Sequence, residues 1–443
     1  MKFQPTYKNI WGISFPIIIA GISETVVDVT DTIFLAHYGI TELAAVGLAT
    51  TIYGVALFLT LGLVDGIQII IARRAGEGQF TEIGEVFNQG IHLLTLAAII
   101  MILFILFIVP MITVDLLASE NIHREVNAYL QISAYALLFQ SFNLAYSAFY
   151  VGISRTKVLI AATALLAVIN IVLDYALIFG NLGFAEMGIE RAAIASLSAE
   201  IAAFLFLTVN VIWRRYDRTY HILRFTKWKN TLSKHLINIS TPISLEALVE
   251  MSKWFLFFII IEQLGERELG MASIIFSCYA LLLIPIDSFS ESACSMVSNL
   301  IGQQKAHQLT LLIRRTIILS YAIVFPMLIM TLLFPEVVLS IFTTDVEMVA
   351  SSINSLMIVA LAIFIAVPGE AFYSTIAGTG DTKAILTIQI IVTIFTLTFA
   401  YVAAFVLKLE LEYIWLAEVF GWLVCLFLSW ILFRSGFWQR LKI

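Results

Sequence analysis

Charged residues are scarce in this chain of 443 residues. Asp, Glu, Lys and Arg together make up 13% of it, whereas hydrophobic residues make up 60%. An ordinary soluble domain has about 25% charged and roughly 45–50% apolar residues. The mean hydropathy of +0.97 excludes a soluble globular protein and predicts a polytopic membrane protein. The net charge of −6 carries less information than the places where the charges lie.

Cysteine is also rare, and its pattern excludes several kinds of site. Cys278, Cys294 and Cys425 all fall in apolar runs without metal-like spacing, so we expect small packing residues and neither a disulfide nor a zinc site. The chain has no nucleophile elbow. We therefore expect no enzyme, no cofactor beyond a coupling ion, and no nucleic-acid partner. Lys2 and Lys8 precede an apolar run without a cleavage site, which favours a retained first helix over a removed signal peptide.

Long apolar runs are abundant. A helix needs about 20 apolar residues to cross about 30 Å of hydrocarbon, and the sequence has twelve such runs. The all-α fold that we expect is a bundle of twelve transmembrane helices. They are predicted at 10–36, 43–72, 88–110, 126–152, 158–180, 188–213, 236–262, 269–300, 311–334, 348–376, 384–407 and 412–433.

The basic residues predict the orientation of these spans. Most of the 25 Lys and Arg residues fall on one side of the membrane, and only Arg124, Arg191, Arg267 and Lys408 fall on the other, while Lys253 lies within a span. Basic residues collect on the cytoplasmic side. We therefore expect a multi-pass protein of the cell membrane with both termini in the cytoplasm.

The two halves of the sequence form an internal repeat. Pro16 and Pro242 lie 226 residues apart, and the same offset relates Gly152 to Gly378 and Thr156-Lys157 to Thr382-Lys383. Each half holds six spans, so the copies share one orientation, with their axis along the membrane normal. We expect a six-helix lobe over 1–213, a basic cytoplasmic linker over 214–235 and a second six-helix lobe over 236–443.

Carboxylates within the predicted spans are the most informative feature. Each would cost about 2.5–3.5 kcal/mol if it faced lipid, and together they would exceed a net stability of about 5–15 kcal/mol. They must therefore face protein, water or a cation. These carboxylates are Glu24, Asp28, Asp31, Asp65, Asp174, Glu200, Glu246, Glu250, Asp287, Glu291 and Glu370.

Helical spacing groups these acids into stripes. Glu24, Asp28 and Asp31 lie on one face of the first span. Glu246, Glu250 and Lys253 repeat this spacing on the seventh, and the 226-residue offset places Glu24 on Glu250 and Asp65 on Glu291.

Purely structural roles remain open for some of these residues. Glu200, Asp287 or Glu370 could be protonated and hydrogen-bonded between helices. Lys253 could form a buried structural pair with Glu250 or Glu246.

Several motifs resemble those of one family. Residues 31–39 read DTIFLAHYG, 43–49 read LAAVGLA and 170–174 read NIVLD, and Phe179-Gly180 follows. The helix ends GISRTK at 152–157 and GTGDTK at 378–383 form a pair. Together these motifs are similar to those of multidrug and toxic compound extrusion (MATE) transporters, within the multidrug/oligosaccharidyl-lipid/polysaccharide flippase superfamily. The resemblance covers the whole chain.

The resemblance implies a cation site in the amino-terminal lobe, formed by Asp31, Asn170, Asp174 and a hydroxyl that we assign to Ser196. It also places the seventh-helix Glu of the NorM-like branch on Glu250. We expect a second coupling or substrate role, centred on the second lobe, for five further residues: Glu250, Lys253, Glu24, Glu291 and Asp65.

The residue types agree with that implication. Carboxylate, amide and hydroxyl oxygens suit a hard ion, so Asp31, Asn170 and Asp174 are candidate Na⁺ ligands. Two nearby acids in a low-dielectric setting could instead carry a proton. Asp28, one turn before Asp31, would support the site, and Pro16 removes a backbone hydrogen bond and offers a bending point.

These expectations combine into a function. We expect a monomeric antiporter, coupled to Na⁺ or H⁺, that exports amphipathic and often cationic small molecules across the bilayer by alternating access. The alternative is a flippase for lipid-linked oligosaccharide, whose pyrophosphate would require basic residues in the cavity.

Overall fold

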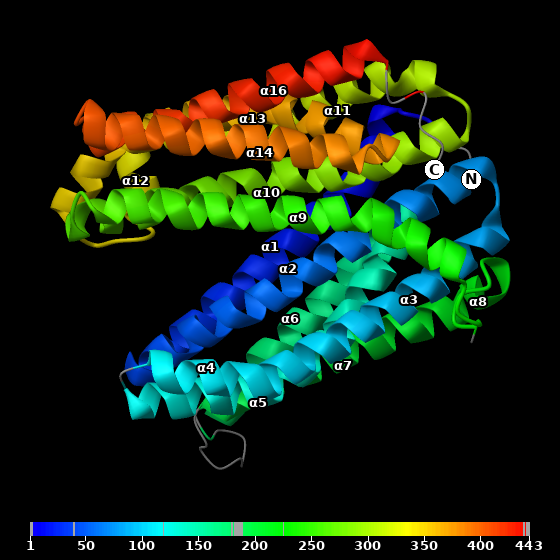
Figure 1. Cartoon of the computed structure of the whole chain (residues 1–443), viewed down its shortest axis with the longest axis horizontal. Helices are drawn as coiled ribbons and strands as arrows, with labels where there is room; N and C mark the ends of the chain where they lie inside the picture. Colours follow the sequence, from blue (N-terminus) through cyan, green and yellow to red (C-terminus); the bar gives the residue numbers. More distant parts are fainter. Residues whose placement is uncertain are drawn as a thin grey trace. The chain divides into compact units, whose positions relative to one another are not determined.

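The computed structural model describes residues 3–38, 40–117, 119–178, 180, 189–224, 226–436 and 439. Every regular element among them is a helix (Figure 1). The motif residues Gly39 and Phe179, and the basic Lys2, lie outside the described residues.

Twelve long helices correspond to the twelve predicted spans. In the first half they are α1 Tyr7–Tyr38, α2 Ile40–Glu77, α3 Phe80–Leu103, α5 Glu120–Gly152, α6 Lys157–Ile178 and α7 Ile189–Trp213. In the second half they are α9 Asn230–Glu262, α10 Glu266–Gly302, α11 Leu309–Leu333, α13 Val346–Thr379, α14 Thr382–Tyr401 and α16 Leu416–Ser435. Shorter elements are η1 Phe104–Ile108, α4 Val109–Leu116, α8 Tyr216–Thr219, η2 Ala306–Gln308, α12 Pro335–Leu339, η3 Val402–Val406 and α15 Leu411–Ile414.

The transmembrane character of the fold is confirmed. Ten of the described helical stretches are both long and apolar enough to cross a membrane. The other two long helices are α5 and α9, each with 33 residues. Polar side chains such as Gln131, Gln140 and Asn143 dilute the hydropathy of α5. Residues of this kind are tolerated in a span when they face other helices.

The repeat is visible where α5 and α13 end. Ser154, two residues after α5, and Gly380, directly after α13, both have left-handed backbones, with φ of 58° and 88°, and they lie at equivalent positions of the repeat. A Cβ added to Gly152 would collide with Ile71, and one added to Gly378 would collide with Val297. Ile71 and Val297 are also 226 residues apart, so the same close helix approach is built twice.

Contacts between residues divide the chain into two compact units. Among the described residues, the first unit covers 19–244, and the second covers 3–18 together with 245–439. Relative to the expected lobes, the start of α1 clusters with the second unit and the start of α9 with the first. Each change comes two residues after an in-helix proline, Pro16 in α1 and Pro242 in α9, so the division follows the repeat.

In the first unit, α2, α5 and α7 pack side by side, and α6 packs on α7 (Figure 1). Two glycines of α2 allow a close approach to the start of α9. A Cβ on Gly62 or Gly66 would overlap Ser244 or Ser240. Small residues four apart on both partners are the usual means of close packing between transmembrane helices.

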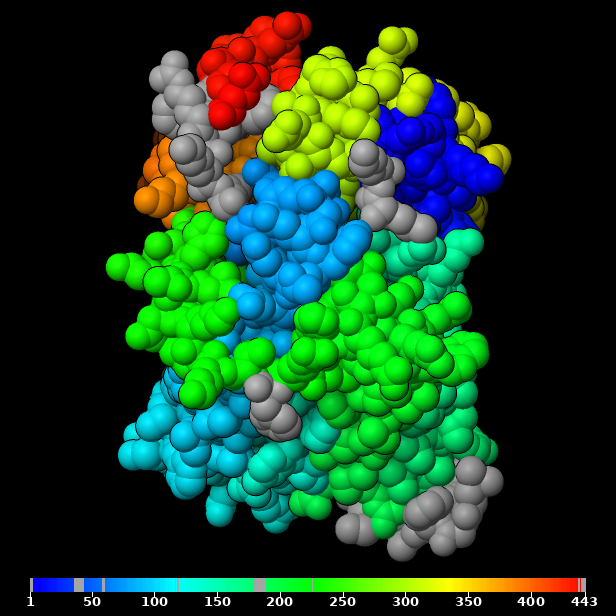
Figure 2. All heavy atoms as spheres, turned by 90° about the vertical axis from the view of Figure 1, so that its right-hand side faces the viewer, coloured from blue at the N-terminus to red at the C-terminus, as the bar shows by residue number. Residues whose placement is uncertain are grey.

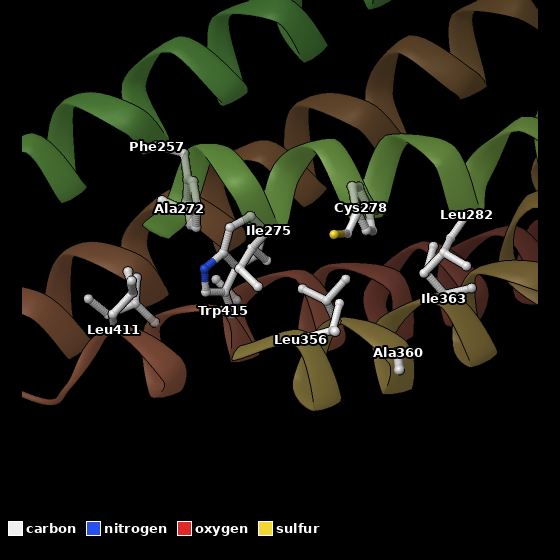
Figure 3. Packing of buried hydrophobic residues seen from close by; sticks show 14 of the residues in the cluster. Phe257, Ala272, Ile275, Cys278, Leu282, Leu356, Ala360, Ile363, Leu411 and Trp415 are labelled. Carbon is white, nitrogen blue, oxygen red and sulfur yellow. The ribbon is translucent and has the colours of Figure 1, made fainter. Parts of the chain in front are cut away.

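In the second unit, α10, α13 and α16 pack together. Figure 3 shows their buried side chains, with Ile275 and Cys278 of α10 near Leu356 of α13 and Trp415 before α16. Cys278 is buried there as a free thiol, which is the packing role that the sequence predicts for it.

The segment between α7 and α9 is packed against the first unit. Asn88 Nδ2 of α3 donates to the carbonyl of His221 at 3.1 Å, and Gln89 Nε2 donates to that of Lys227 at 2.8 Å. Figure 2 shows this green segment on the surface that faces the viewer. The expected linker is therefore anchored to α3 by hydrogen bonds to its main chain.

Candidate functional site

Four predicted residues from three helices meet in the first unit. With the Asn170 amide oriented so that both of its ends are satisfied, Nδ2 donates to Asp31 Oδ1 and to Asp174 Oδ2, each at 3.0 Å. The same amide's Oδ1 accepts from Ser196 Oγ at 3.2 Å. The two carboxyl groups also lie within hydrogen-bonding reach of each other. This set of residues is called the first-unit cluster below.

Helix geometry explains why these residues meet. Asn170 and Asp174 are one turn apart on α6, so they share a face, and both are almost completely buried, at 1% and 0% exposure. That face packs on α7, which supplies Ser196. Asp31 of α1 is only partly exposed. A polar face on an otherwise apolar helix is thus turned inward, where its groups find partners.

In the described structure, the first-unit cluster contains a carboxylate oxygen without a hydrogen-bond donor and no basic side chain that pairs with its acids. Asp174 Oδ1 is buried and has no hydrogen-bond partner among the described residues. Within the described part of the chain, neither Asp31 nor Asp174 forms an ion pair. Two ionised carboxylates this close would repel strongly in a low-dielectric setting. The arrangement therefore requires a proton or a bound cation.

The amide of Asn170 can serve either state. In the opposite orientation Nδ2 donates to Ser196 Oγ at 3.2 Å, and Oδ1 then faces the two carboxylates. That orientation gathers oxygen atoms from three side chains, which is favourable only when a cation lies between them. No trio of His, Cys, Asp or Glu in the described residues is placed to hold a metal ion, so a cation here would depend on the neutral amide and hydroxyl as well as on the two acids.

Tyr129 of α5 is a neighbour that no sequence motif indicated. Its side chain is 9% exposed and interacts electrostatically with Asp31, Asp174 and Asp28. It lies near the predicted start of the fourth span, where a single tyrosine is typical of the membrane–water interface. Only the packing of α5 in the first unit brings it to the acids.

The other predicted residues of the first unit lie around the cluster. Asp28 is exposed on α1 and interacts with Asp31. Glu24 interacts with Glu200 of α7, whose carboxylate accepts from Asn143 Nδ2 of α5 at 2.6 Å. No contact joins Asp65 to Asp31 or Asp174 in the described structure. The structure therefore brings Asp28 to the cluster and leaves Asp65 apart from it.

In the second unit, Lys253 has a partner that the sequence did not suggest. Its Nζ lies 3.3 Å from Glu418 Oε1 of α16, and the two side chains are 7% and 3% exposed. Tyr279 donates to Glu418 Oε2 at 3.3 Å, and Trp422 Nε1 donates to the Tyr279 hydroxyl at 2.7 Å. The ammonium lies 4.4 Å from the centroid of the Trp254 ring.

The predicted partners of Lys253 were therefore wrong. Glu246 accepts from the Tyr373 hydroxyl at 2.9 Å, and the ion pair joins Lys253 to Glu418, which lies 165 residues away in the sequence. The predicted set of intramembrane carboxylates omits Glu418, although this residue falls within the predicted span 412–433; in the structure it lies in the first turn of α16.

Further acids of the second unit gather around α10. Glu370 of α13 accepts from Ser290 Oγ at 2.5 Å. Asp287 of α10 interacts electrostatically with Glu370 and Glu250, and Glu291 follows Asp287 by one turn. Glu250 thus belongs to a group of carboxylates that packing, and not adjacency in the sequence, assembles.

Comparison with known proteins agrees with this architecture. The family model MatE matches residues 16–176 and again residues 242–402, two ranges that begin 226 residues apart, which confirms the internal repeat. A relative from Thermotoga maritima, named probable multidrug resistance protein NorM, is 24% identical over 439 residues and covers 98% of this chain and 93% of its own length. A relative of the same name from Synechocystis is 25% identical and covers 69% of this chain and 66% of its own length.

Solved structures share the fold. A MOP superfamily transporter from Pyrococcus furiosus superposes with a TM-score of 0.90 at 20% identity, covering 99% of this chain and 98% of its own. An outward-facing multidrug resistance MATE family transporter superposes with a TM-score of 0.90 at 21% identity, covering 100% and 98%. With the family model matched in both halves, the chain belongs to the MatE family, whose members are MATE transporters.

Proposed function

We propose that this protein is a multidrug antiporter that exports amphipathic organic cations in exchange for Na⁺ or H⁺. The relatives' name, multidrug resistance protein NorM, supports export of toxic small molecules. The observation that carries the coupling is the first-unit cluster, in which two carboxylates, an amide and a hydroxyl converge, with no basic partner for the carboxylates among the described residues.

The first-unit cluster supports an exchange mechanism. When a cation binds between Asp31 and Asp174, it neutralises the acids that would otherwise attract a positively charged substrate. A cation and a cationic drug therefore compete for the same negative charge, and binding of one favours release of the other. Alternating access then carries each of them across in turn. Na⁺ is our preferred coupling ion, because Asn170 and Ser196 add neutral oxygen atoms that a proton does not need.

The second unit is proposed to contribute to substrate binding or coupling. Glu250, Glu291 and Asp287 lie on α9 and α10 in a unit that also holds Glu370. Lys253 forms an ion pair with Glu418, so its charge is not free to bind a pyrophosphate. This pairing favours the antiporter over the lipid-linked oligosaccharide flippase, which needs cationic groups that are free to bind phosphate. We further propose that the protein works as a monomer in the cell membrane with both termini in the cytoplasm.

The test is transport by purified protein in proteoliposomes with separately imposed sodium and pH gradients. We expect efflux of a cationic dye such as ethidium to be driven by one of these gradients. Asp31→Asn should abolish the gradient-driven component. Asp115→Asn, a matched loss of one exposed acid at the end of α4, should transport like the wild type.

Two results would contradict the proposal. Gradient-driven transport by Asp31→Asn at the wild-type rate would remove Asp31 from the coupling site. Failure of the wild-type protein to move any cationic dye under either gradient, together with movement of a lipid-linked pyrophosphate, would support the flippase instead.

A further inference from the structure

A basic cleft lies in the second unit where α1 and α11 begin. It encloses about 370 Å³, within the size range of ligand sites, roughly 300–1,000 Å³. Three of its lining side chains can carry positive charge, namely Lys305, His307 and Arg315, and they come from the connection between α10 and α11 and from the start of α11. The remaining lining residues are Gln4, Pro5, Thr6, Gln308 and Leu311. Figure 2 shows the dark blue amino-terminal residues beside the lime segment that contains this connection.

Hydrogen bonds hold the walls of the cleft in place. Gln303 Nε2 donates to the carbonyl of Phe3 at 3.1 Å, and the Arg315 guanidinium donates to the carbonyl of Pro5. That guanidinium also lies 5.1 Å from the centroid of the Tyr7 ring. The amino-terminal segment is thus held against α11, and the basic side chains are held around the space between them.

No acidic side chain of the lining stretches, and no ion pair of the described residues, neutralises the charge of Lys305 and Arg315. No Asp or Glu occurs between Phe3 and Ser23 or between Ser292 and Pro335, the two stretches that supply every lining residue. In the described part of the chain, neither Lys305 nor Arg315 takes part in an ion pair. The positive ends of two helices add to the same potential, because α1 begins at Tyr7 and α11 at Leu309. The cleft therefore suits an anion that comes from outside the chain.

The neighbouring surface indicates the kind of anion. Trp11 and Phe15 are exposed on α1 and stack with their ring centroids 5.2 Å apart, one and two turns beyond Tyr7. On α11, Leu311 lines the cleft, and Ile318 and Phe325 continue the same exposed face at seven-residue spacing. Both stripes belong to helices that are long and apolar enough to cross a membrane. A ligand that fills the cleft would have an apolar surface directly beneath its charged group.

We propose that this cleft binds the headgroup of an anionic phospholipid, with the acyl chains lying along the exposed faces of α1 and α11. Basic pockets between transmembrane helices recognise phosphate headgroups through charge-assisted hydrogen bonds. Lys305 and Arg315 contact the phosphate, Thr6 and Gln308 offer polar contacts to the headgroup, and Trp11 packs against the chains. Under the proposed orientation this lipid belongs to the cytoplasmic leaflet.

The test is native mass spectrometry of the full-length protein in detergent, titrated with dioleoyl phosphatidylglycerol. We expect one tight lipid, and phosphatidylcholine should bind about tenfold more weakly or less. The double variant Lys305→Gln/Arg315→Gln should raise the dissociation constant for phosphatidylglycerol by about tenfold or more, since it removes two charge-assisted contacts. The control Lys227→Gln/Lys234→Gln removes two exposed charges outside the cleft and should change it less than twofold.

The alternatives give different results. Equal losses in the two double variants would mean that diffuse charge attracts the lipid and would overturn the site. Competition by millimolar inorganic phosphate would show a free-anion site instead. Because Arg315 also donates a hydrogen bond to the carbonyl of Pro5, Lys305→Gln/His307→Gln provides a second variant, which leaves that contact in place. Unchanged lipid binding by this variant, with an unchanged melting temperature in phosphatidylcholine, would also contradict the proposal.

Discussion

The two units place buried acids in opposite electrostatic settings. In the first unit, Asp31 and Asp174 share an amide and lie within reach of each other, and neither forms an ion pair with a basic side chain among the residues that the structure describes. In the second unit, Glu418 lies against the Lys253 ammonium in a site closed by aromatic rings. The ion pair of the second unit already holds a positive charge, whereas the first-unit cluster, under the proposed function, takes its positive charge from solution. The difference teaches that buried acids of the same kind can have a fixed basic partner in one unit and be left for the proposed exchangeable ion in the other.

The largest change in stability is expected when the ion pair between Lys253 and Glu418 is broken. Glu418→Gln leaves the buried Lys253 ammonium without its counter-charge, and breaking a buried pair in this way destabilises a protein by about 3–5 kcal/mol. Thermal unfolding in detergent should show a strongly lowered melting temperature. The double variant Lys253→Met/Glu418→Gln removes both charges and should recover most of the loss. A double variant as unstable as the single one would mean that the ion pair is not what stabilises this site.

Sodium should stabilise the folded protein by binding to the first-unit cluster. If Na⁺ binds the folded protein there, about 100 times its dissociation constant should stabilise the wild type by about 2.7 kcal/mol. Asp31→Asn should lose this stabilisation, and Lys253→Met/Glu418→Gln should keep it. The measurement is the melting temperature in sodium chloride against choline chloride at equal ionic strength. A sodium effect that survives in Asp31→Asn would move the ion site elsewhere, and the absence of any effect in the wild type would favour the proton.

A smaller change in sodium affinity is expected when the hydroxyl of Ser196 is removed. Ser196→Ala removes one neutral oxygen and the hydrogen bond to Asn170 but keeps both carboxylates. We expect the dissociation constant for Na⁺ to rise about tenfold, which corresponds to about 1.4 kcal/mol. The sodium dependence of the transport rate measures it, and Ser198→Ala, on the next part of α7, is the matched control. Equal sodium dependence in both variants would exclude Ser196 as a ligand.

The smallest change in stability is expected at the equivalent turns after α5 and α13. Ser154 and Gly380 share a left-handed backbone, which disfavours side chains with a Cβ by about 1 kcal/mol. Ser154→Gly should therefore stabilise the protein slightly, and Gly380→Ser should destabilise it by a similar amount. Denaturant unfolding compares the two. Changes of the same sign would show that the two turns are not equivalent despite the repeat.

Much of the fold could be predicted from sequence patterns. The apolar runs predict the twelve long helices because crossing a bilayer demands a fixed length of apolar helix. The spacing of Asn170 and Asp174 predicts that they share a face, and the resemblance adds Asp31 and Ser196, which the structure places beside them. The roles of Tyr129 and Glu418 could not be predicted in this way. Neither is marked by a motif or a stripe on its own helix, and each meets its neighbours only through the packing of other helices.

Sequence patterns are enough to establish a membrane-embedded helical repeat with acids in its spans, because length, periodicity and composition act locally along the chain. The packing of the helices decides which of those acids share a site and which have a counter-charge, because both depend on distances between helices far apart in the sequence. Lys253 illustrates the difference: its own helix offered Glu246 and Glu250, yet α16 brings Glu418 to it.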